Sequence, residues 1–144
     1  MTKQKIKLCV GLPRSGKSTW AREQGLPIVS ADAVRLAMHG KRFDKAFEPA
    51  VWTFVYMMAD ALFRAGCPEI IVDETSVTKE RRDKWRQKFP DAEVEIKVFD
   101  TPIHVCLQRA IDTKQEDLIP VIYRMAEEWD LPWNWDGLGA GMEV

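Results

Sequence analysis

The sequence has few of the residues on which secreted or metal-stapled small proteins depend. Its 144 residues include three cysteines, Cys9, Cys67 and Cys106, an odd number without the spacing of a metal-binding knuckle. The longest mostly apolar stretch, residues 50–63, is too short to span a bilayer and contains Asp60. No signal-peptide core follows the first residues. These absences exclude a disulfide scaffold and predict a reduced, cytoplasmic protein without a membrane partner.

An excess of charge of either sign is also lacking. Twenty-one Lys and Arg residues face 22 Asp and Glu residues, so the formal net charge is −1. A nucleic-acid partner would therefore have to be held by a local basic patch, because no global positive field exists. With 46% apolar and 30% charged residues and no internal repeat, the chain is neither disordered nor fibrous. Its length is that of one domain with a substantial core.

Apolar runs alternate with helical patterns along the chain. Strand patterns occupy residues 6–10, 27–29, 69–72 and 93–99. Helical patterns occupy about residues 17–24, 31–38, 49–66, 79–88, 102–111 and 120–129, with Ser30, Thr78 and Thr101 as expected caps. A buried stripe is expected on the third helix at Val51, Trp52, Phe54, Val55, Met58, Ala59 and Leu62. The alternation predicts an α/β fold with a parallel sheet, followed by a Trp- and Gly-rich, partly irregular tail over residues 131–144.

Residues 11–18, Gly-Leu-Pro-Arg-Ser-Gly-Lys-Ser, satisfy the pattern G-x-x-x-x-G-K-[ST] of a phosphate-binding loop. A strand precedes this loop and a helix follows it, which is the context that the motif requires. In such a loop backbone N–H groups bind phosphate oxygens, Lys17 lies between the β- and γ-phosphates, and the Ser18 hydroxyl ligates Mg²⁺. The sequence therefore predicts a nucleoside triphosphate site formed by Gly11, Pro13, Arg14, Ser15, Gly16, Lys17, Ser18 and Thr19.

The third predicted strand ends in two acidic residues, Asp73 and Glu74. A carboxylate at the end of a strand beside the phosphate-binding loop can hold Mg²⁺ or its water ligands. Asp73 is the better candidate because it directly follows the apolar run. The alternative is that both residues are loop or helix-capping acids.

Asp32 and Arg35 follow the second strand and share one face of a helix. Open α/β sheets bind ligands at the carboxyl ends of their strands, so an aspartate here can accept a proton from an attacking hydroxyl. The spacing leaves a second interpretation equally open, in which Asp32 is a favourable first-turn acid paired with Arg35. The following segment 39–45, with Lys41 and Arg42, is either a phosphate-binding patch or a solvated basic loop.

The motifs at residues 11–21, 30–35, 72–82 and 97–102, together with Arg109, occur in an order that resembles the 5′-kinase domain of the bacteriophage-type polynucleotide kinase/phosphatase family. The resemblance covers about residues 5–130. It implies a three-layer P-loop NTPase fold with about four parallel strands and a helical lid, so that residues 1–130 form one kinase domain. It also implies ATP as donor, Mg²⁺, the 5′-hydroxyl of DNA or RNA as acceptor, and a host-cytoplasm location if the gene is carried by a phage.

Carried over position by position, the resemblance implies three catalytic residues: Lys17 in the loop, Asp32 as general base, and Arg109 at the start of the lid. It implies that Arg35 holds the acceptor phosphate, with Lys41 and Arg42 as further candidates from the basic segment. Where the family carries a second lid arginine, this sequence offers only Lys114 as a donor-phosphate ligand, and a lysine makes no bidentate phosphate contact.

Nothing in the sequence resembles the phosphatase half of that family, so only kinase activity is expected. Two alternatives stay open. One is a P-loop kinase that acts on a hydroxymethyl pyrimidine in DNA or on a small-molecule hydroxyl. The other is a nucleotide-binding module without catalysis. The oligomeric state is left open as well.

Overall fold

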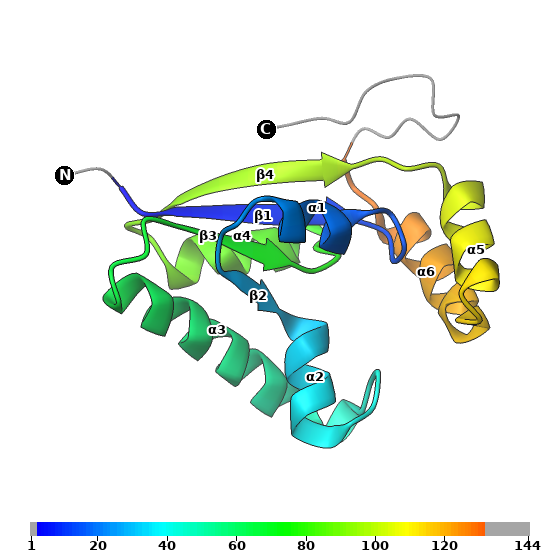
Figure 1. Ribbon diagram of the computed structural model, residues 1–144, viewed down its shortest axis with the longest axis horizontal. Coiled ribbons are helices and arrows are strands. Elements are labelled where there is room, and N and C mark those ends of the chain that lie inside the picture. The colour runs from blue at the N-terminus through cyan, green and yellow to red at the C-terminus, as the bar shows by residue number, and fades with distance from the viewer. Residues whose placement is uncertain (1–2, 132–144) are drawn as a thin grey trace.

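Four short apolar segments form a parallel sheet in the order β2-β3-β1-β4. β1 is the central strand and pairs with β3 on one side and β4 on the other, with Leu8 opposite Val72 and Ile96. The strands are β1 Lys5–Gly11, β2 Ile28–Ser30, β3 Glu69–Asp73 and β4 Glu93–Phe99. This computed structural model describes residues 3–131, and it confirms the predicted sheet, with β4 at an edge (Figure 1).

Helices cover both faces of this sheet, as expected for a three-layer fold (Figure 1). They are α1 Lys17–Glu23, α2 Ala31–His39, α3 Glu48–Arg64, α4 Lys79–Lys88, α5 Ile103–Asp112 and α6 Ile119–Glu128, with 3-10 turns η1 Lys45–Phe47 and η2 Glu116–Leu118. Alternate side chains of β1 face opposite layers, because successive residues of a strand point to opposite sides. Leu8 packs with residues of α3 and α4, whereas Cys9 packs with Ala21 of α1.

The helical pair α5–α6 lies beyond the carboxyl ends of the strands (Figure 1). Its apolar face closes on Leu12, the second residue of the phosphate-binding loop, which is fully buried. The residues that surround Leu12 are Cys106 and Ala110 of α5, Leu118 of η2 and Ile122 of α6. The loop and the expected helical lid are thus joined by one small apolar core.

One expectation about helix α3 and one about helix α6 need correction. The fully buried stripe of α3 is narrower than predicted, namely Val51, Val55 and Ala59, and Phe54 is 49% exposed because it lies to one side of that stripe. The predicted end of α3 near Gly66 is confirmed, since the helix ends at Arg64 and Gly66 follows with a left-handed φ of 94°. Helix α6 ends at Glu128, since Trp129 takes an extended conformation at its carboxyl end.

Of the three expected caps, two are confirmed and one is wrong. The Ser30 and Thr78 hydroxyls accept hydrogen bonds from the third residues of α2 and α4. Thr101 does not cap α5. Its hydroxyl donates instead to the Ser15 carbonyl at 2.8 Å, and this contact ties the segment after β4 to the phosphate-binding loop.

Two of the three cysteines, Cys9 and Cys106, are fully buried. Burial raises the pKa of the Cys9 thiol to about 12, so this residue packs as a hydrophobic group and is not a reactive thiolate. Among residues 3–131, no helix combines the length and apolar character needed to cross a bilayer. The predicted irregular tail lies, from residue 132 onward, outside the described residues, and the division at residue 130 stays a prediction.

Candidate functional site

A cleft of about 1080 Å³ opens where the four strands end. Its walls come from segments that follow different strands: the phosphate-binding loop after β1, α2 after β2, and residues 73–78 after β3. Helices α3, α4 and α6 complete the lining. The cleft therefore lies at the edge of the sheet where open parallel sheets bind their ligands.

Two glycines fix the ends of the phosphate-binding loop. Gly11, at the end of β1, is closely packed, and Gly16, just before α1, has a left-handed conformation. At Gly11 a Cβ would lie 2.6 Å from the Ser15 Oγ and 3.0 Å from the Phe99 Cβ, so only glycine fits without rearrangement. Gly16 has a φ of 104°, which side chains other than glycine rarely adopt. The loop geometry thus accounts for both glycines of the motif.

Lys17 points back across the loop. Its Nζ donates hydrogen bonds to the carbonyl oxygens of Gly11 and Leu12, at 3.0 and 2.7 Å, and lies 3.3 Å from the Ser15 Oγ. Burial lowers the pKa of this lysine, while the negative charge of Asp73 opposes that effect. The ammonium group is consequently held by backbone carbonyls at the centre of the loop.

Ser18 and Asp73 meet across the first turn of α1 and the end of β3. The Ser18 hydroxyl donates to the Asp73 Oδ2 at 2.7 Å. Mg²⁺ prefers such oxygen ligands and completes its octahedron with phosphate oxygens and water, so these two side chains fit the ion. Within residues 3–131 no cluster of three or more His, Cys, Asp or Glu side chains could hold a metal by itself. The assignment of Ser18 and Asp73 as Mg²⁺ ligands stays a prediction.

Glu74, the second acidic residue after β3, has a structural role in the described protein. Its Oε1 accepts hydrogen bonds from the Ser76 hydroxyl at 2.5 Å and from the Trp85 Nε1 at 3.0 Å. Burial raises the pKa of Glu74, although both hydrogen bonds act in the opposite direction. Glu74 therefore anchors the segment after β3 to helix α4.

Asp32 and Arg35 lie in the same cleft as the loop, and a third residue holds them. Arg35 donates through Nε and one terminal nitrogen to both carboxylate oxygens of Glu48, at 3.0 and 2.8 Å. Its other terminal nitrogen donates to the Asp32 Oδ1 at 2.8 Å. The Asp32 side chain is 80% exposed, whereas those of Arg35 and Glu48 are 17% and 19% exposed. Arg35 thus connects a partly buried ion pair with Glu48, the Arg35–Glu48 clamp, to an exposed carboxylate.

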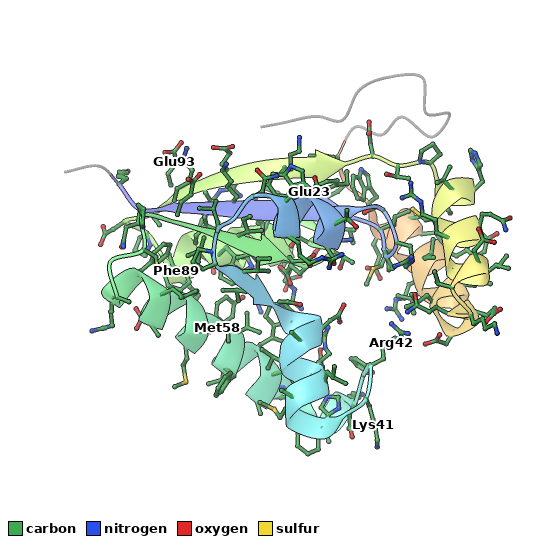
Figure 2. The ribbon with its side chains drawn as sticks, in the orientation of Figure 1. Glu23, Lys41, Arg42, Met58, Phe89 and Glu93 are labelled. Atoms are coloured by element: carbon green, nitrogen blue, oxygen red, sulfur yellow. The ribbon has the colours of Figure 1, made fainter. Side chains whose placement is uncertain are left out.

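The basic segment after α2 divides its two predicted ligands. Arg42 lines the cleft and donates from Nε to the Asp117 Oδ2 of η2 at 2.6 Å. Lys41 does not line the cleft, and its Nζ lies 3.7 Å from Asp44 in its own loop. Figure 2 shows Arg42 on the side of the loop that faces α6 and Lys41 at its outer end. The structure therefore brings Arg42, but not Lys41, to the candidate site.

Of the two predicted lid residues, Arg109 lies at the cleft and Lys114 does not. Arg109 lines the cleft and donates to the Arg14 carbonyl at 3.1 Å. Lys114 follows the end of α5 in a left-handed turn, with φ at 57°, and it does not line the cleft. A cation that was not predicted, Arg124 of α6, lines the cleft. Its Nε lies 3.9 Å from the Glu128 Oε1, one turn later in the same helix.

Three cleft residues were not identified from the sequence: Glu48, Arg81 and Arg124. Glu48 is 13 positions from its partner Arg35, so no local spacing indicates the pair. Arg81 belongs to a helix with charged residues on every side, which reads as a solvated surface. Nothing in the sequence around Arg124, apart from its own positive charge, indicates that it lines the cleft.

A family model described as an AAA domain matches residues 6–118. The chain belongs to this AAA-domain family. Among solved structures, a chain of the Pnkp1/Rnl/Hen1 complex is similar over 76% of this chain and 40% of its own length, with 27% identity and a TM-score of 0.68. A chain of the Pnkp1/Rnl/Hen1 RNA repair complex is similar over 96% of this chain and 51% of its own length, with 21% identity and a TM-score of 0.69.

A third similar structure is the APS kinase CysC of Mycobacterium tuberculosis in complex with AMPPNP and APS. It has 21% identity and a TM-score of 0.62, over 93% of this chain and 86% of its own length. The chain thus spans about half or less of the first two matched chains and most of the third. Together these findings support a P-loop kinase-like phosphotransferase domain of the AAA-domain family, without specifying its acceptor.

Proposed function

We propose that the protein transfers the γ-phosphate of ATP to a 5′-hydroxyl of DNA or RNA, as a polynucleotide kinase does. One observation carries this proposal: a single cleft contains both the phosphate-binding loop with Lys17 and the Asp32–Arg35 pair. A protein that only binds nucleotide has no need of an exposed carboxylate and an arginine held beside it. The pair therefore favours an enzyme over a nucleotide-binding module.

In the proposed reaction, Asp32 accepts the proton of the acceptor hydroxyl as its oxygen forms a bond to the γ-phosphorus. The bond between that phosphorus and the β–γ bridging oxygen breaks, and ADP leaves with the electron pair. Lys17 and Arg109 neutralise charge on the phosphates, while Arg35 holds the acceptor. Mg²⁺, held by Ser18 and Asp73, would neutralise the charge of the β- and γ-phosphates.

The distribution of arginine supports a nucleic-acid acceptor. Seven of the ten arginines in the sequence line this cleft, namely Arg14, Arg22, Arg35, Arg42, Arg81, Arg109 and Arg124. With Lys17 they give the lining eight cationic side chains against six acidic ones, which is a local excess of positive charge in a chain whose net charge is −1. A polyanion is attracted by a local excess of this kind. A chain of an RNA repair complex shares this fold.

The proposal is tested by an acceptor screen with γ-labelled ATP and Mg²⁺. The arms are a 5′-hydroxyl DNA oligonucleotide, the matching RNA, a duplex with hydroxymethyluracil, APS, and no acceptor. We expect label to enter the DNA or RNA oligonucleotide. Transfer only to the modified duplex, or only to APS, would identify that molecule as the acceptor and contradict the polynucleotide proposal. Transfer to none of the acceptors would overturn kinase function.

The role of Asp32 is tested by Asp32→Ala, with Asp60→Ala on the outer side of α3 as a matched control. Loss of a general base should lower the turnover number by at least about 10²-fold. ATP affinity, measured by calorimetry, should stay near that of the wild type. Full transfer by Asp32→Ala would show that Asp32 is not the base.

A further inference from the structure

Beside the Arg35–Glu48 clamp, the cleft contains a second fixed arginine that no role yet explains. The guanidinium carbon of Arg81, in the first turn of α4, lies 4.0 Å from the ring centroid of Trp52 on α3. Both side chains are partly buried and line the cleft. Trp52 and Arg81, which are 29 positions apart in the sequence, thus place a cation over an aromatic ring.

The Trp52–Arg81 pair belongs to the acceptor side of the cleft. The pKa of Glu48 is lowered chiefly by its hydrogen bond from Arg35, and Trp52 and Arg81 act on the same carboxylate. Glu48 is therefore a common neighbour of both arginines. Arg35, however, contacts Asp32 directly, whereas Arg81 has no hydrogen bond to Asp32 in the described structure. Arg81 is thus a second cation beside Glu48 in the wall of the cleft.

The chemistry of Arg81 differs from that of its neighbours on α4. Arg82 is paired with Asp130 and Arg86 with Asp83, so the charges of these two are compensated. Within residues 3–131 no carboxylate forms an ion pair with Arg81.

The positive charge of Arg81 acts on Glu48 and Glu74, and its side chain also interacts with the Tyr56 hydroxyl. A guanidinium has five N–H donors, so a group that uses its face for an aromatic ring and one donor for Tyr56 keeps further in-plane donors for an oxyanion.

We propose that Arg81, laid on the ring of Trp52, forms a second acceptor subsite that binds the phosphodiester one nucleotide inward from the phosphate assigned to Arg35. This inference rests on the proposed polynucleotide acceptor and adds a length preference to it. An acceptor with two or more phosphates engages both arginines, whereas a nucleoside 3′-monophosphate engages Arg35 alone.

The test compares Arg81→Gln with the wild type on two acceptors, a 5′-hydroxyl decanucleotide and a nucleoside 3′-monophosphate. Loss of one charge-assisted hydrogen bond to phosphate should raise the KM for the decanucleotide about 10- to 100-fold. The increase should be at least tenfold smaller for the mononucleotide. Arg86→Gln removes the same charge from the same helix outside the cleft and is the matched control.

Salt dependence gives a readout that a purely structural role of Arg81 would not move. For a single strand, each phosphate contact contributes about −0.7 to the slope of log affinity against log salt. Arg81→Gln should reduce the slope for the decanucleotide by about that amount, as measured by fluorescence anisotropy. Trp52→Phe, which keeps an aromatic face, should retain most of the wild-type affinity.

Equal losses on the two acceptors would overturn the second subsite, and so would an unchanged salt slope or an equal effect of Arg86→Gln. These outcomes are distinct from failure of the proposed function. In that case the wild type itself would phosphorylate neither the decanucleotide nor the mononucleotide.

Discussion

The clamp between Glu48 and Arg35 leads to a quantitative prediction about which carboxylate holds the acceptor arginine. Arg35 has two carboxylate partners at almost equal distances: Glu48 at 2.8 and 3.0 Å, and Asp32 at 2.8 Å. Their surroundings differ, because the Glu48 side chain is 19% exposed and that of Asp32 is 80% exposed. We expect the buried, bidentate contact to stabilise the fold much more than the exposed one.

The magnitudes follow from these exposures. Hydrogen bonds to charged groups contribute about 1.5–3 kcal/mol when they are shielded from water, and the Arg35–Glu48 pair makes two of them. Exposed ion pairs contribute about 0–1 kcal/mol. Two shielded hydrogen bonds set an upper limit of about 3–6 kcal/mol. Because both side chains keep some contact with water, double-mutant cycles of Glu48→Gln with Arg35→Gln should give about half of that coupling free energy, about 1.5–3 kcal/mol. The cycle of Asp32→Asn with Arg35→Gln should give less than about 1 kcal/mol.

The assay is urea unfolding followed by tryptophan fluorescence, at neutral pH and again in acid. The pKa of Glu48 is depressed in the folded protein, chiefly by the hydrogen bond from Arg35. Its contribution to stability is thus fully present above the pKa of an unfolded glutamate and is lost as the pH falls through the lower, folded value. Coupling to Arg35 that is larger for Asp32 than for Glu48 would refute this account of the clamp.

Two further predictions concern residues that shape the site from within. Burial raises the pKa of Glu74, so its carboxyl should destabilise the fold as the pH rises from the unfolded pKa through the raised, folded value. Glu74→Gln keeps an acceptor for Trp85 and should therefore gain stability over the wild type across that range; a urea midpoint difference that does not change with pH would contradict this. At Gly11, an alanine Cβ would lie 2.6 Å from the Ser15 Oγ and 3.0 Å from the Phe99 Cβ, so Gly11→Ala should cost about 1–3 kcal/mol of stability and weaken ATP binding. A wild-type melting temperature and ATP affinity for this variant would show that the loop tolerates the extra methyl group.

Local patterns in the sequence predict most of this fold, because strand and helix signals act over a few residues. The apolar run before Gly11 and the turn signals after it are sufficient to predict β1 and the phosphate-binding loop. The cap at Ser30 likewise defines the start of α2. Thr101 is not the cap because α5 begins at Ile103, so that Pro102 occupies the cap position. The Thr101 hydroxyl donates to the Ser15 carbonyl, 86 positions away. Long-range partners of this kind leave no local signal.

The same distinction applies to the candidate site. The places of Lys17 and Ser18 in the cleft are predictable from the motif of residues 11–18, and that of Asp32 from its position directly after β2. The spacing of Asp32 and Arg35 left the role of Asp32 open.

Glu48 and Arg81 are not predictable, because their roles depend on where α3 and α4 pack beside α2. Lys114 was an expectation from family resemblance alone, and the turn after α5 takes it away from the cleft.

Backbone groups hold the cations on the donor side of the cleft, whereas side chains hold those on the proposed acceptor side. This difference affects which substitutions could change the acceptor. Backbone carbonyls hold the donor side, since Lys17 and Arg109 both donate to carbonyl oxygens of the loop. Substitutions leave such acceptors in place. Side chains hold the acceptor side: Glu48 fixes Arg35, and Trp52 supports Arg81. Under the proposed function, point substitutions in α3 and α4 should therefore alter acceptor binding while the phosphate-binding loop keeps its geometry.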